Sequence, residues 1–157
     1  MSDWIERLKQ QEEATRRERE RNQETENRKA RIVSVKARPL WDTVIAQLKL
    51  DVAELRNIFS GDPSKDLQFL EHEDGFVVVR NGFPHVTLYA RWIEELTGVG
   101  IDLETQRSEY ATKDKKKNEI KFKWASEDSV SMTFDERVHM MAGSLSEELL
   151  RKLIEFR

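Results

Sequence analysis

Three histidines are the first residues to consider for metal binding or acid–base catalysis, because imidazole titrates near neutral pH. They are His72, His85 and His139. His72 lies in the acidic run 71–74 (EHED), which gathers nitrogen and oxygen ligands, but no second histidine and no cysteine stands at a metal-ligand spacing. We interpret this run as a solvated turn before a strand, and we expect surface positions for His85 and His139. No metal and no cofactor is predicted.

Two carboxylates, Asp102 and Glu104, are spaced to lie on one face of a strand. Such a pair can support general acid–base chemistry, but no third group completes a constellation here. The sequence also contains neither a glycine-rich phosphate loop nor a serine-hydrolase motif in the strand–turn–helix context that it needs. We interpret the pair as the polar side of a strand, and we expect a protein that is not an enzyme.

The segment 111–119 (ATKDKKKNE) is the one local concentration of positive charge. We expect it to form a charged loop in which Lys113, Lys115, Lys116 and Lys117 are possible anion-binding residues. The net charge of the chain is −3, which does not favour nucleic acid as a partner. Lysines also keep hairpin tips soluble and protect sheet edges, and this is the interpretation that we prefer.

A different kind of candidate lies at the N-terminus, where Trp4, Ile5 and Leu8 precede a long polar stretch. Residues 10–31 contain only two aliphatic side chains, both alanines, and are otherwise mostly Glu, Gln and Arg. These are good helix formers, although the same composition is compatible with disorder. If helical, residues 9–31 hold the apolar residues about 33 Å from the rest of the chain, at about 1.5 Å per residue. Trp4, Ile5 and Leu8 are therefore interface candidates.

The next helix is predicted over 41–59, where apolar residues recur every three or four positions. We include Trp41 of this apolar stripe among the interface candidates. Arg38–Pro39 predicts a break before the helix, since proline disfavours helical conformation in the residue that precedes it. The domain boundary is accordingly placed there, with a charged helical arm over 1–37 and a globular domain over 38–157.

Beyond residue 75 the hydrophobic period changes from that of a helix to that of a strand. Two runs meet at the turn dipeptide Asn81–Gly82 and predict a hairpin. In the second run Val86, Leu88, Ala90 and Trp92 alternate with polar residues. Further strands are expected over 101–110, 120–125 and 129–134, and a final helix begins at 143–147. The pattern predicts an α+β fold, with an antiparallel meander sheet of about five strands and helices on one face.

The composition narrows the setting of the protein. The chain of 157 residues has no cysteine, and 36% of its residues are charged. No apolar run approaches the roughly 18 residues of a membrane span, and no secretory signal or glycosylation motif is present. We therefore expect a cytoplasmic protein with no membrane partner.

These observations leave three hypotheses open. The first is a non-enzymatic protein–protein interaction or self-assembly module, most simply a homodimer, that uses the arm as its docking element. The second is a small-molecule-binding or catalytic domain with a pocket between the sheet and helix 41–59. The third and weakest is nucleic-acid binding through the loop 113–117.

Overall fold

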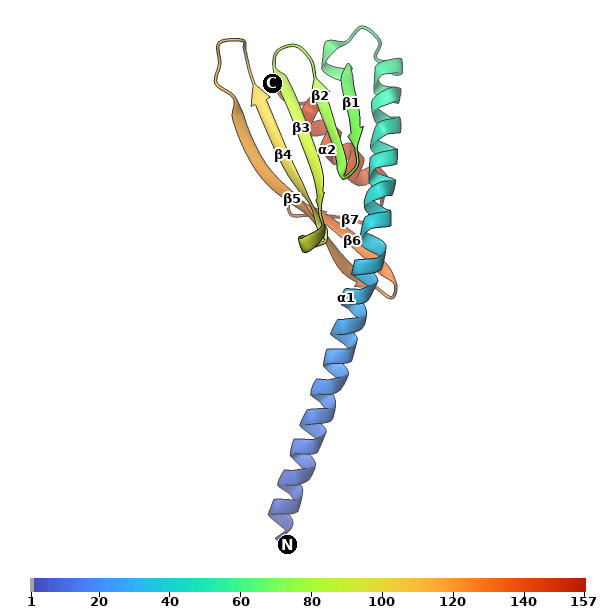
Figure 1. Cartoon of the computed structure of the whole chain (residues 1–157), viewed down its shortest axis with the longest axis vertical. Helices are drawn as coiled ribbons and strands as arrows, with labels where there is room; N and C mark the ends of the chain where they lie inside the picture. Colours follow the sequence, from blue (N-terminus) through green and yellow to red (C-terminus); the bar gives the residue numbers. More distant parts are fainter. Residues whose placement is uncertain (1) are drawn as a thin grey trace.

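One helix, α1 (Asp3–Ile58), runs through more than a third of the chain. The computed structural model describes residues 2–157 and shows α1 as a rod whose N-terminal half projects from the body, as in Figure 1. The C-terminal half packs on an antiparallel sheet and on a second long helix, α2 (Ala142–Ile154). The predicted arm is therefore helical, and it is continuous with the helix that enters the core.

The predicted break at Arg38–Pro39 is wrong, because Pro39 lies inside α1. Proline lacks the N–H that would bond to the carbonyl of Val35, four residues earlier. Both residues are exposed, so water can reach that carbonyl. On the opposite side Ala37 and Trp41 are fully buried, and their packing holds the helix together across the proline. The expected boundary between residues 37 and 38 consequently falls within one helix.

The sheet has seven strands in sequential order, each antiparallel to its neighbours. The strands are β1 (Leu67–His72), β2 (Gly75–Arg80), β3 (His85–Ile93), β4 (Gly98–Gln106), β5 (Asp114–Ser126), β6 (Ser129–Phe134) and β7 (Arg137–His139). Short 3-10 helices, η1 (Pro63–Lys65) and η2 (Glu94–Leu96), precede β1 and β4. The α+β class and the antiparallel meander are confirmed, with seven strands where about five were expected.

The additional strands lie at the two edges of the sheet. β1 pairs with β2 over the full length of β1, and the three-residue β7 pairs with β6. The charged segment 111–119, expected as a loop, is extended from Asp114 onward, where β5 begins. Its lysines pair with β4, where Lys115 is opposite Glu104 and Lys117 is opposite Asp102. A cross-strand neighbour of opposite charge stabilises the extended conformation that the local sequence does not favour.

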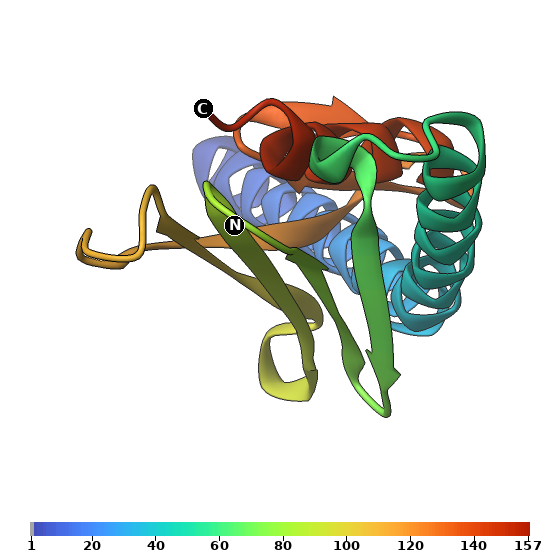
Figure 2. The ribbon, with the colours of Figure 1, turned by 90° about the horizontal axis from the view of Figure 1, so that it is seen from above.

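Both long helices cover one face of the curved sheet. Figure 2 shows α2 against the sheet, with the C-terminal half of α1 beside it. The apolar stripe of α1 is buried there over residues 41–52, and Trp41 stacks on Phe76 of β2 at 5.5 Å between ring centroids. The end of the stripe, at Ile58 and Phe59, is exposed. The predicted apolar face of β3 is confirmed, since Val86, Leu88, Ala90 and Trp92 are all buried, whereas Thr87 of the predicted polar face is also buried. The core therefore lies between the helices and this face.

Gly75 shows how closely the strands approach one another at one corner of the sheet. A Cβ atom added there would lie 2.0 Å from the carbonyl oxygen of Ala90 in β3. Only glycine fits at that point of the β1–β2 hairpin. Within residues 2–157, no helix combines the length and the hydrophobicity needed to cross a membrane.

Candidate functional site

The N-terminal end of α1 carries an apolar patch that no other part of the chain covers. Trp4 is 61% exposed, and Ile5 and Leu8 are 39% and 45% exposed. In Figure 1 this end of the helix lies at the far end of the molecule from the sheet. Transfer of apolar surface out of water is favourable, at about 25 cal/mol per Å². A partner that covers these three residues therefore lowers the free energy of the system. We call Trp4, Ile5 and Leu8 the tip patch.

The stretch between the tip patch and the body is a solvated rod. Its ion pairs are local and weak: Arg16 lies 4.0 Å from Glu20, and Lys29 lies 3.5 Å from Glu26. Contact with the body begins at Lys29, whose ammonium group lies 4.4 Å from the centre of the Trp124 ring. Lys36 then donates a hydrogen bond of 2.6 Å to the carbonyl of Asp128. Residues 9–28 therefore act as a spacer that holds the tip patch away from the body.

Trp41, expected as an interface residue, is fully buried. Besides stacking on Phe76, its indole nitrogen lies 3.5 Å from the carbonyl oxygen of Asp74. A partner could reach this side chain only if the core opened. The periodicity that singled out Trp41 marks the face of α1 that packs on the sheet, so Trp41 contributes to the core and is not available as an interface residue.

The lysines of segment 113–117 lie beside the two carboxylates considered as an acid–base pair. The carboxylate of Glu104 forms ion pairs with the ammonium groups of Lys113, at 3.3 Å, and Lys115, at 4.0 Å. The register places Lys116 opposite Leu103 and Lys117 opposite Asp102. The lysines of segment 113–117 and the carboxylates of Asp102 and Glu104 thus neutralise each other's charge on neighbouring strands. This pairing reduces the positive potential available to an anion.

His139 was expected at the surface but is buried. Its Nε2 contacts the carboxylate of Glu148, and its Nδ1 lies 3.0 Å from the hydroxyl of Ser144. The three residue types match those of a hydrolytic triad. However, the Ser144 hydroxyl donates its single proton to the carbonyl of Met141, at 3.0 Å, and so cannot also donate it to the imidazole. The arrangement is suited to fixing the start of α2 against β7.

The other histidines remain close to the surface. His72 is exposed at the end of β1, and His85 is half-buried at the start of β3. Over the described part of the chain, no three acidic or histidine side chains come together in a way that could hold a metal ion. Within residues 2–157, every buried side-chain nitrogen and oxygen also has a hydrogen-bond partner.

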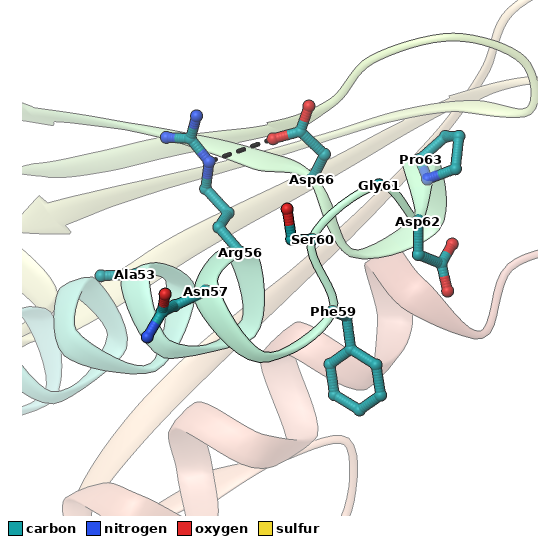
Figure 3. Close-up of a pocket in the computed structure, with 9 residues that line it drawn as sticks. All are labelled: Ala53, Arg56, Asn57, Phe59, Ser60, Gly61, Asp62, Pro63 and Asp66. Carbon is teal, nitrogen blue, oxygen red and sulfur yellow. Dashed lines mark hydrogen bonds and ion pairs between the residues drawn. The ribbon is translucent and has the colours of Figure 1, made fainter.

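A hollow of about 580 Å³ lies beside the C-terminal end of α1. Arg56 and Asp66 form an ion pair of 3.0 Å across it, whereas Phe59 and Asp62 point away from that pair, as Figure 3 shows. The hydrogen bond from Lys65, together with those from the Ser64 side chain and amide, lowers the pKa of Asp62 to about 2. Asp62 therefore stays ionised at neutral pH and caps η1. The polar side chains that line the hollow, Arg56, Asp62 and Asp66, do not converge on one point where a ligand would bind.

A second hollow, of about 400 Å³, opens between α1 and α2 and has an apolar floor. The interface between α1 and the sheet is occupied by core side chains, which include Trp41, Val44 and Leu48. The chain matches no protein-family model, and neither a curated protein nor a solved structure shows detectable similarity to it. The geometry of the molecule is therefore the basis for its function, and the tip patch is one of the apolar surfaces that intramolecular packing leaves exposed.

Proposed function

We propose that this protein is a non-enzymatic interaction module that associates with a second copy of itself through its N-terminal helix. The observation that carries the proposal is the exposure of the tip patch at the end of a rod without core contacts. Large aromatic side chains such as Trp4 are enriched among the residues that dominate binding free energies. A homodimer is the simplest closed assembly of identical chains.

The spacer favours an intermolecular role over an intramolecular one. Because α1 is a single helix, it cannot bend back and bring the tip patch onto the sheet of the same chain. The rod carries charges of both signs, which keeps it solvated without strong attraction to nucleic acid. Hydrogen bonds fix the polar groups at His139 and Asp62 in structural roles, which favours a binding role over catalysis. We place the protein in the cytoplasm, consistent with its lack of cysteine.

The test is the mass of the full chain in solution, measured by sedimentation equilibrium over a wide concentration range. We expect a dimer that Trp4→Ser weakens by about 2 kcal/mol or more, as is typical of an interface hot spot. Val35→Ser is the matched control, because Val35 is a 72% exposed apolar residue of the same helix outside the tip patch. A full chain that stays monomeric at every concentration contradicts the proposal.

A further inference from the structure

The groove between α1 and α2 has the form of a helix-binding site. Leu150 is almost fully buried at its base, with Leu55 and Ile154 half-buried beside it. Ile58 stands at the mouth with 63% of its surface exposed. Leu50 is 65% exposed and continues the same face of α1, one turn before Glu54 of the groove. An amphipathic helix laid along this wall would cover apolar surface that the chain itself leaves open.

Negative charge surrounds this apolar floor. The groove is lined by four carboxylates and a single guanidinium: Asp51, Glu54, Glu147, Glu155 and Arg151. Arg151 is already bound to Glu147 at 3.0 Å and to Glu155 at 2.8 Å. Asp51 accepts hydrogen bonds from Ser146 and Gln47. Within residues 2–157, Glu54 forms neither an ion pair nor a side-chain hydrogen bond, so the rim retains a carboxylate for an incoming cation.

The tip patch has the complementary pattern. At about 3.6 residues per turn, Trp4, Ile5 and Leu8 share one face of α1, with Arg7 on one side of that face and Lys9 on the other. The acidic residues of the same segment, Asp3 and Glu6, lie on the opposite side of the helix. The end of the rod is thus an apolar stripe with positive flanks, and it matches an apolar groove with a negative rim.

The tip patch cannot reach the groove of its own chain. Both belong to α1, and the distance along the helix from Trp4 to Leu55 is about 77 Å at about 1.5 Å per residue. Two chains with antiparallel α1 helices avoid this restriction. If Trp4 of one copy lies at Ile58 of the other, then Leu8 falls near Glu54 and Gln11 near Leu50. The same register applies to the tip patch of the second copy and the groove of the first.

We propose that the tip patch of each chain docks in the α1–α2 groove of a second copy, so that two antiparallel α1 helices form a reciprocal dimer. This inference rests on the proposed self-association and specifies where the arm binds. Each dimer contains two tip–groove contacts related by a twofold axis, which closes the assembly and leaves no unpaired groove. The partner's Arg7 and Lys9 then flank the acidic rim, close to Glu54.

Disulfide trapping tests the register, and the natural chain helps because it has no cysteine. The variant carries Gln11→Cys and Leu50→Cys, which leaves the tip patch intact and alters no buried residue. Within one chain these positions lie about 58 Å apart along α1. A disulfide requires Cα atoms within about 7 Å, so a bond between residues 11 and 50 can form only between chains. We expect a covalent dimer on mild oxidation, with the 11–50 linkage identified by peptide mass spectrometry.

Three controls define the trapping result. Gln23→Cys with Leu50→Cys places the first thiol farther along the rod and should give little covalent dimer. The single variants Gln11→Cys and Leu50→Cys should remain uncrosslinked. A bond between two copies of residue 11 would show parallel arms and would overturn the antiparallel register, while ladders of more than two linked chains would overturn the reciprocal closure.

Charge reversal tests the rim independently. Glu54→Lys, and separately Arg7→Glu with Lys9→Glu, should each raise the dimer dissociation constant several-fold, and the combined variant should recover most of the loss. Arg17→Glu with Arg21→Glu is the matched control, because both residues lie on the side of the rod opposite the tip patch. If the full chain is monomeric, both the self-association and this pairing fail. If Trp4→Ser disrupts a dimer that neither links 11 to 50 nor responds to Glu54→Lys, only the groove is wrong.

Discussion

His139 connects two elements that follow one another in the sequence, β7 and α2. Through Ser144 and Glu148 it holds the first two turns of α2 against β7, the short edge strand. Removal of the imidazole leaves the half-buried Glu148 carboxylate without its partner, and such a loss costs about 1–3 kcal/mol. We therefore expect His139→Ala to lower the free energy of unfolding by that amount, as measured by urea denaturation.

Ser144→Ala is the control for this prediction, because it removes a more exposed hydroxyl and keeps the His139–Glu148 pair. Its effect should be clearly smaller. Equal losses in the two variants would show that the hydroxyl, rather than the carboxylate contact, fixes the start of α2. No loss in either variant would contradict the structural role assigned to the network.

The sequence predicted buried apolar residues far better than buried polar ones. The spacing of Trp41, Val44 and Leu48 is sufficient to place them on one helix face, because helical periodicity is a local property. The burial of His139 depends on how β7 and α2 pack against each other. The four-residue spacing of Ser144 and Glu148 was the available signal, since it places both on one side of α2. Without the packing, that signal does not identify the third partner.

At the scale of elements, α1 tolerates a proline because its exposed side faces water. The missing hydrogen bond at Pro39 and the clash of its ring with the preceding turn remain unfavourable, at about 3 kcal/mol for a helix interior. The rigidity of proline in the unfolded chain offsets part of this. Pro39→Ala should therefore raise the free energy of unfolding by about 1–2 kcal/mol.

Urea denaturation measures this change, and Thr43→Ala is a suitable comparison. Thr43 lies one turn later on the exposed side of α1, and its hydroxyl donates to the carbonyl of Pro39. That replacement improves helix propensity only slightly. A loss of stability in Pro39→Ala would indicate that the proline bends α1 in a way that the packing of Trp41 requires.

The strands differ in how far the sequence predicts them. β3 was identified because it alternates buried and exposed residues over most of its length. The first part of β5 was not, since Lys115, Lys116 and Lys117 favour neither a strand nor burial. That segment is extended because β4 presents Asp102 and Glu104 opposite it, and cross-strand register is not a local property of the sequence. β7, with three residues, is too short for a periodic signal.

For the whole molecule, length is the property that is easiest to measure. α1 has 56 residues and is therefore about 84 Å long, well beyond the size of the sheet and α2. Small-angle X-ray scattering of the monomeric Trp4→Ser variant should give a maximum dimension of at least that length. A maximum dimension typical of a globular protein would show that the rod is not helical without a partner.

The rod lacks core packing, so its helical state depends on intrinsic propensity and on pairs such as Arg16–Glu20. Each pair of this kind contributes only about 0.2–0.5 kcal/mol. The pairs that form are Arg16–Glu20 and Lys29–Glu26, and exposed side chains of this kind exchange partners at little cost. The sequence thus favoured a helix over a disordered arm without determining which charges pair.

Because α1 is unbroken, the length of the rod also determines the direction in which its N-terminal end faces around the helix axis. One residue inserted between positions 10 and 28 would turn Trp4 by about 100° around the axis while moving it only about 1.5 Å. Seven inserted residues would nearly restore its orientation but displace it by about 10 Å. A change of length in this segment is therefore never neutral for the direction in which Trp4 faces, although no residue of the segment takes part in the core.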